Sequence, residues 1–146
     1  MITDAQRRLF DDLLEGIITD LPQHLHALLE EVPLIVEDRP SARLLEEMGI
    51  DPRLSDLCGL HEGIALTRRS VEHSGVMPDR MMLFREPIIR LAGYRNVPTR
   101  RVGHLRRAAR QSSQEGLEEQ IRITLLHEIG HHFGLDEDDL DRLGYA

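Results

Sequence analysis

The stretch TLLHEIGHHFGLDEDDL, residues 124–140, contains three of the chain's eight histidines within six positions. Residues four apart on an α-helix project from the same face, so His127 and His131 lie one turn apart on one side. At about 100° per residue, His131 lies about 40° and Glu128 about 100° from His127 around the helix axis. Two imidazoles with a carboxylate beside them are the donor set of a catalytic zinc site. His132, at about 140°, is not expected to be a ligand.

The rest of this helix supports the metal hypothesis. Its other side is apolar, which predicts a buried helix: Leu125, Leu126, Ile129 and Phe133. Buried histidines and a buried glutamate need polar partners, and a metal ion supplies them. The alternative is that His127 and His131 are ordinary core histidines. The motif H-E-x-x-H arises by chance in about one of thirty shuffled chains of this composition, so the motif alone does not exclude this alternative. Gly134 suits the left-handed conformation that ends a helix and turns the chain back.

A third protein ligand is expected just after this turn, because only fifteen residues follow His131. The extended zinc motif H-E-x-x-H-x-x-G-x-x-[H or D] places its third ligand at Glu137. Asp136 and Asp138 flank this residue and could replace it if the turn differs. The alternative interpretation of DEDD, residues 136–139, is an exposed acidic helix start. Both interpretations hold together if one carboxylate turns inward.

Composition limits the setting of this site. A chain of 146 residues is long enough for one hydrophobic core, so we expect a single domain over residues 1–146. The net charge of −8 argues against a general nucleic-acid binder. Cys58 is the single cysteine, which excludes a disulfide framework and a cysteine-based zinc site. Since we find no signal peptide and no apolar run of about 18 residues, we expect a cytoplasmic protein without a membrane partner. The oligomeric state stays open.

Helical periodicity is clearest near the N-terminus. Thr3 and Gln6 have the spacing of a capping box, and an apolar stripe follows them as far as Pro22. The next elements are expected to be a short helix over about 22–30, a buried strand in VPLIVED (32–38) and a helix in SARLLEEMG (41–49).

Two more strands are predicted in the middle of the chain, EGIALTRR over residues 62–69 and DRMMLFREP over 79–87. Residues 93–113 contain six arginines and no acidic residue. We interpret this segment as a solvated loop with a short helix over 103–110, and the alternative is a basic rim that attracts an acidic substrate or partner. The last long helix is expected over 114–133.

The chain resembles the small bacterial zincin-like metallopeptidases over most of its length. The similarity is carried by VPLIVEDRPS (32–41), LCGLHEGIALTRRSVEHSGVMPDRMMLFREPI (57–88) and, most specifically, TLLHEIGHHFGLDEDDLDRLGYA (124–146). The resemblance implies an α+β, minimal zincin-like fold. In that fold a small mixed β-sheet packs on N-terminal helices and a C-terminal zinc-binding helix.

The resemblance also assigns roles to individual residues. His127 and His131 match the two histidine ligands of the family, and Glu128 matches its catalytic glutamate. The family usually has aspartate at the position of Glu137, so this chain keeps a carboxylate and lengthens it by one methylene. The Arg-rich segment over 94–113 departs from the family pattern.

The leading functional hypothesis is a zinc-dependent metallopeptidase. Zn²⁺ would be held by His127, His131 and Glu137, and Glu128 would be the general base toward a zinc-activated water. Peptides or proteins would be the substrates, and DRMMLFRE, residues 79–86, is the expected edge strand for pairing with them. The candidates for stabilising the oxyanion are Tyr94, His104 and Tyr145.

Two alternative functions use the same metal site. One is a zinc-binding interaction module of zincin fold without peptidase turnover, and the other is a hydrolase of non-peptide substrates. Glu128 favours an enzyme, because a purely structural zinc site has no use for a carboxylate beside an open coordination position.

Overall fold

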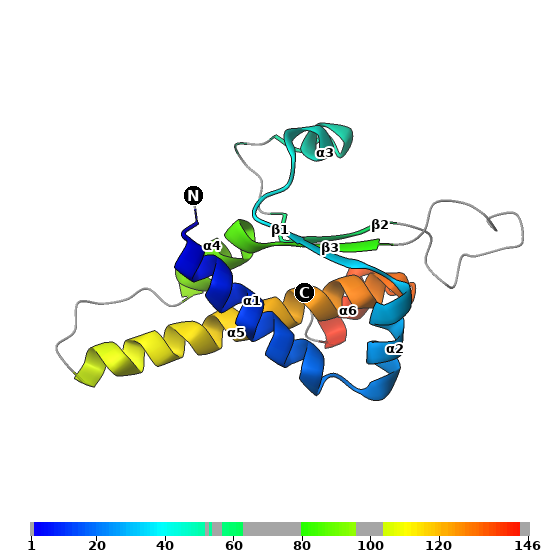
Figure 1. The fold of residues 1–146 in the computed structure, drawn as a ribbon. Helices are drawn as coiled ribbons and strands as arrows, with labels where there is room; N and C mark the ends of the chain where they lie inside the picture. The colour runs from blue at the N-terminus through cyan, green and yellow to red at the C-terminus, as the bar shows by residue number, and fades with distance from the viewer. Residues whose placement is uncertain (1, 52, 54–56, 63–79, 96–103, 144–146) are drawn as a thin grey trace, which may run out of the picture.

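The computed structural model describes residues 2–51, 53, 57–62, 80–95 and 104–143. The chain has an α+β architecture, as the sequence predicted (Figure 1). The helices are α1 (Asp4–Asp20), α2 (Gln23–Glu31), α3 (Ala42–Glu47), α4 (Arg85–Arg95), α5 (His104–His132) and α6 (Glu137–Leu143). The strands are β1 (Leu34–Glu37), β2 (Gly59–Glu62) and β3 (Arg80–Phe84). Among the described residues, no helix combines the length and the apolar character that a membrane span requires.

The three strands form one mixed sheet in the order β1-β3-β2. β1 pairs with β3 in parallel, and β2 pairs with β3 antiparallel, so that Gly59 lies opposite Leu83. Because β3 is the central strand, the prediction that residues 79–86 form an edge strand is wrong. The physical reason is visible in the sequence: residues 81–84 are a continuous apolar run and all are buried, as in a strand covered on both faces.

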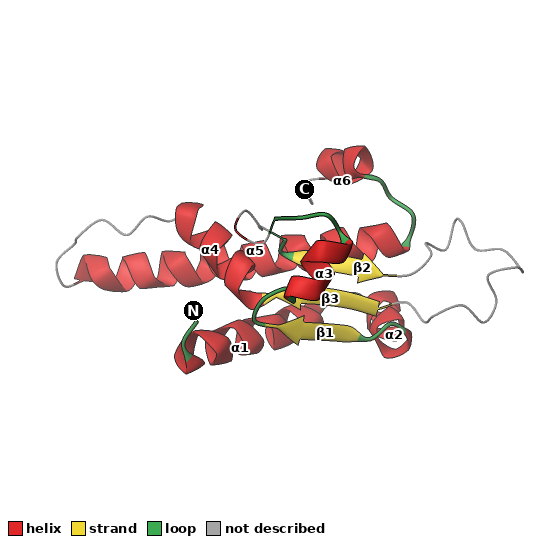
Figure 2. Ribbon diagram, turned by 90° about the horizontal axis from the view of Figure 1, so that it is seen from above, coloured by secondary structure: helices red, strands yellow, loops and turns green. Residues whose placement is uncertain are grey.

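Helices cover both faces of the sheet, but unequally. α1, α2 and α5 lie on one face and α3 lies on the other (Figures 1 and 2). Successive side chains of a strand point to opposite faces, so Met81 and Leu83 of β3 enter the same core. The helical residues of this core are Phe10, Leu14, Ile17, Leu25, Leu28, Ile88, Ala92, Leu117, Ile121, Leu125 and Ile129. This packing fixes α5, the helix that carries the H-E-x-x-H motif, against the sheet.

The predicted capping box of α1 is confirmed. The Thr3 hydroxyl oxygen accepts a hydrogen bond from the Gln6 backbone N–H at 3.1 Å, and the Gln6 side chain accepts one from the Thr3 N–H at 2.8 Å. Ser41 likewise caps α3 by accepting from the Leu44 N–H at 3.0 Å. These bonds satisfy backbone donors that have no partner inside the helix.

One helix was not predicted, and another differs from its predicted boundaries. α4 begins at Arg85, where we expected β3 to continue; Pro87 lies in its first turn, where a missing N–H leaves no bond unmade. α5 is one continuous helix, whereas we expected a break between 110 and 114. The residues at that point are Gln, Ser and Ser, and none of them is a strong helix breaker.

The strand predicted over residues 62–69 also differs. β2 begins earlier, at Gly59, and ends at Glu62. The remainder of that prediction and the turn-rich segment after it, residues 63–79, lie outside the described residues.

Asp38, directly after β1, links three elements through its carboxylate and its backbone. Arg7 of α1 donates to it from Nε and Nη2, at 3.0 and 2.9 Å, and Arg85 of α4 donates from Nη1 at 3.0 Å. The Asp38 carbonyl accepts from the Glu86 N–H at 2.9 Å. Hydrogen bonding by the Arg7 guanidinium lowers the pKa of Asp38 below its usual value.

Asp38→Asn should lower the melting temperature by about 2–4 °C at neutral pH, because the amide cannot pair as a charge with either arginine. The Asp38 side chain is 38% exposed, so solvent screening keeps the effect small. Glu47→Gln is the matched control, because its pair with Arg43 is exposed and lies within α3.

The sign of the pH dependence follows from the lowered pKa. The contribution of Asp38 is present above the unfolded-state pKa of about 4 and is lost as the pH falls through the folded-state pKa. Thermal melts of the wild type and Asp38→Asn should therefore converge below about pH 4. A difference in melting temperature that grew as the pH fell would contradict this role of the Asp38 carboxylate.

Candidate metal centre

The end of α5 returns the chain toward its own last turn. Gly134 has the left-handed φ of 86° that the sequence predicted. Its N–H donates to the His131 carbonyl at 3.0 Å, and the Leu135 N–H donates to the Gly130 carbonyl at 3.0 Å. This pair of bonds is the Schellman ending of a helix. It brings the start of α6 back over the histidines of α5.

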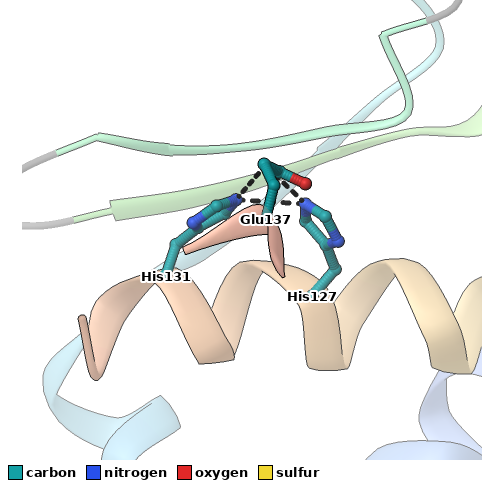
Figure 3. A group of neighbouring side chains, drawn as sticks. All are labelled: His127, His131 and Glu137. Atoms are coloured by element: carbon teal, nitrogen blue, oxygen red, sulfur yellow. Dashed lines mark hydrogen bonds and ion pairs between the residues drawn. The ribbon is translucent and has the colours of Figure 1, made fainter. Parts of the chain in front are cut away.

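Three side chains converge in this turn (Figure 3). Nε2 of His127 lies 3.0 Å from Nε2 of His131. Oε1 of Glu137 lies 3.3 Å from the first nitrogen and 3.0 Å from the second. Among the described residues, these three form the group that could hold a metal ion. The structure thus brings together the three residues that the sequence singled out.

The geometry of this group fits a metal ion. A tetrahedral zinc ion with bonds of about 2.0–2.1 Å holds its ligand atoms about 3.3 Å apart, close to the observed separations. Nδ1 of His131 lies 3.2 Å from the Leu135 carbonyl oxygen, which can only accept, so Nδ1 carries the proton. The lone pair of His131 is then on Nε2 and faces the other two donor atoms.

The acidic residues at the start of α6 also cap that helix. The Asp136 carboxylate accepts from the Asp139 N–H at 2.9 Å, and the Asp139 carboxylate accepts from the Asp136 N–H at 3.1 Å. Asp136 therefore caps the helix, whereas Glu137 turns toward the histidines and Asp138 is exposed. The segment is therefore an acidic helix start, as one interpretation predicted, and one of its carboxylates also turns toward the histidines.

Glu128 lies one residue beyond His127 and is buried between α5 and β2. It is 5% exposed, and its Cγ packs against the backbone at Gly59. Burial raises the pKa of Glu128 to about 7, an effect that charge on His127 opposes and the charge of Glu137 reinforces. A cation bound by the neighbouring cluster would favour the charged carboxylate.

Residues 29–145 match the family described as zincin-like metallopeptidase, and this range includes the whole cluster. The chain belongs to the zincin-like metallopeptidase family. No curated protein matches the chain significantly. Family membership and the mixed sheet packed on helices confirm the fold class that the sequence predicted. The metal-binding and catalytic roles of individual residues stay predictions.

This family member has a buried polar stripe that sequence reasoning missed. Gln120, Thr124, Glu128 and His132 follow at four-residue spacing along one face of α5, and each is at most 6% exposed. They are the buried polar side chains among the described residues. The spacing was readable from the sequence, but only the packing of β2 over this face shows that it is buried.

His132 lies outside the metal cluster, as the sequence predicted. Its Nδ1 is 3.4 Å from Nε2 of His61, which joins α5 to β2. Phe133, by contrast, was expected on the buried side and is 39% exposed. The proposed oxyanion partners Tyr94, His104 and Tyr145 fall among side chains that the structure does not describe.

The purified protein should hold about one zinc ion per chain, and His127→Ala or His131→Ala should remove most of it, because each substitution removes one of three protein ligands. Elemental analysis after dialysis measures this. His24→Ala, on the exposed surface of α2, is the control and should keep full zinc. Full zinc in the double variant of His127 and His131 would exclude this site.

Glu137→Gln should weaken zinc binding at least tenfold, because the amide removes the negative charge nearest to the two histidine nitrogens. Asp136→Asn and Asp138→Asn are matched neighbours and should leave the zinc affinity nearly unchanged. Competition with a chelating dye measures all three. Equal, small effects would mean that Glu137 contributes only to an acidic helix start.

Proposed function

We propose that this protein is a zinc-dependent peptidase whose metal is held by His127, His131 and Glu137. The observation that supports it best is the cluster of three donor atoms at 3.0–3.3 Å, with the buried carboxylate of Glu128 on the adjacent helical position. Three protein ligands leave one position of a tetrahedral ion for water or substrate, which is the arrangement of a catalytic rather than a structural zinc site.

Each residue has a distinct task in the proposed reaction. When bound, zinc would polarise the scissile carbonyl and lower the pKa of water toward about 7. Glu128 accepts a proton from the attacking water while the water oxygen forms a bond to the carbonyl carbon. Glu128 then donates that proton to the leaving nitrogen as the C–N bond breaks. The Leu135 carbonyl holds the ring of His131 in the orientation and tautomer that binding requires.

The proposed substrate is an extended segment of a peptide or protein. β2 rather than β3 is the strand that such a segment would extend, because among the described strands β2 is at the edge of the sheet on the side of α6 (Figure 2). Pairing with an edge strand uses the backbone of the substrate, so it selects for extended chain more than for particular side chains.

Glu128→Gln should separate binding from chemistry. The amide is nearly isosteric and cannot take a proton, so the zinc content should stay at the wild-type level. The rate of cleavage should fall by about 10²–10⁴-fold. Hydrolysis of an unfolded protein and of a diverse peptide library at neutral pH, with zinc present, measures the rate.

The control for this prediction is Glu115→Gln, on an exposed part of the same helix, which should cleave like the wild type. Wild-type protein that carries zinc and cleaves nothing across the library would support the interaction module instead. Equal rates in Glu128→Gln and the wild type would exclude Glu128 as the base.

A further inference from the structure

β2 lies so close to α5 that a side chain at Gly59 would crowd its neighbours. A Cβ at this position would come within 3.0 Å of Cγ of Glu128, 3.0 Å of Cγ2 of Thr124 and 3.1 Å of the Met82 carbonyl oxygen. Real Cβ atoms have few contacts this short. By comparison, a Cβ at Gly16 or Gly93 would have no heavy atom within 4 Å.

Space rather than backbone conformation is the reason for glycine here. The described glycines with positive φ are Gly49 and Gly134, and Gly59 is not one of them. Gly59 lies within a regular strand, where glycine is otherwise a poor choice because it has no side chain to pack. A glycine in a strand often marks a bulge, a tight bend or a close approach to the backbone, and the distances at Gly59 match the last of these.

The three groups around Gly59 differ in how easily they can move. The Met82 oxygen belongs to the backbone of the central strand, and Thr124 is held by a 2.8 Å bond from its hydroxyl to the Gln120 carbonyl. β2 itself is held by pairing with β3 and by the contact of His61 with His132. The flexible neighbour is therefore the side chain of Glu128, and an added methyl group would displace it.

We propose that Gly59 is a positioning residue for Glu128. Its missing side chain lets the backbone of β2 lie directly on Cγ of Glu128, the atom next to the carboxyl group, and so fixes where that carboxylate points. This inference rests on the proposed function for its catalytic consequence. Its structural part, the coupling between positions 59 and 128, is independent of any activity.

The first experiment compares Gly59→Ala with the wild type and with Gly16→Ala, an exposed helical glycine without close neighbours. Gly59→Ala should keep its zinc, because Glu128 is not among the metal ligands. A misplacement of a catalytic group by about 1 Å can cost about 10²-fold. Relief of this contact needs a shift of only a few tenths of an ångström, so kcat should fall by roughly threefold to tenfold while KM changes little. Gly16→Ala should match the wild type in both. Unchanged kcat in Gly59→Ala would overturn the proposal.

The second experiment is a double-mutant cycle on the melting temperature of the zinc-loaded protein, which needs no activity. Gly59→Ala should be destabilising in the wild-type background and, once Glu128→Ala has removed the contacting Cγ, should cost roughly half as much. Equal losses in the two backgrounds would overturn the proposal. Relief by Thr124→Ser but not by Glu128→Ala would also overturn it, because the contact would then be packing against the helix alone.

Two further outcomes stay interpretable. If Gly59→Ala fails to fold, recovery of a cooperative melt in the double variant with Glu128→Ala supports the coupling, and continued failure overturns it. If the wild type binds zinc and cleaves nothing, the proposed peptidase function fails, whereas the cycle still decides whether Gly59 positions Glu128.

Discussion

Two imidazole nitrogens and a carboxylate oxygen lie 3.0–3.3 Å apart, and their lone pairs repel one another unless a proton or a cation lies among them. The structure around them imposes this approach. The helical turn places the two histidines, the left-handed Gly134 reverses the chain, and the reversed chain brings Glu137 over the same turn. The bond from His131 to the Leu135 carbonyl comes from that reversed segment as well. A cation would convert this repulsion into attraction, so metal binding should also stabilise the fold.

Glu128 adds a second electrostatic cost beside the first. Burying a charged side chain costs an effective free energy of the order of several kcal/mol. Glu128 is buried under β2 and is 5% exposed. The proposed function gives this cost a context, because a buried carboxylate beside a bound metal would be placed for proton transfer.

The sequence was sufficient to predict that the side chains of His127, His131 and Glu137 converge, because their geometry is local. His127, His131, Gly134 and Glu137 lie within eleven residues, and helical spacing plus a glycine ending determine their arrangement. The strand order is a long-range property. Residues 81–84 were taken for an edge although their uniform apolarity is typical of a central strand, and α4 was missed because Pro87 resembled a strand end. The close approach of Gly59 to Glu128 joins positions 69 residues apart, and no local pattern predicts it.

In the proposed chemistry, the metal ligands depend on local contacts, whereas the position of the general base depends on long-range contacts. The proposed metal ligands belong to one segment, the end of α5 and the start of α6, so their arrangement depends little on the sheet. The direction of the Glu128 carboxylate depends on β2, which is held in turn by the buried central strand. Changes in the sheet should therefore alter the position of the base while leaving the metal in place, and changes in the turn should do the reverse. In the proposed function, a chain of this size would hold its metal with a short helical segment and use its small sheet mainly to orient the group that acts beside the metal.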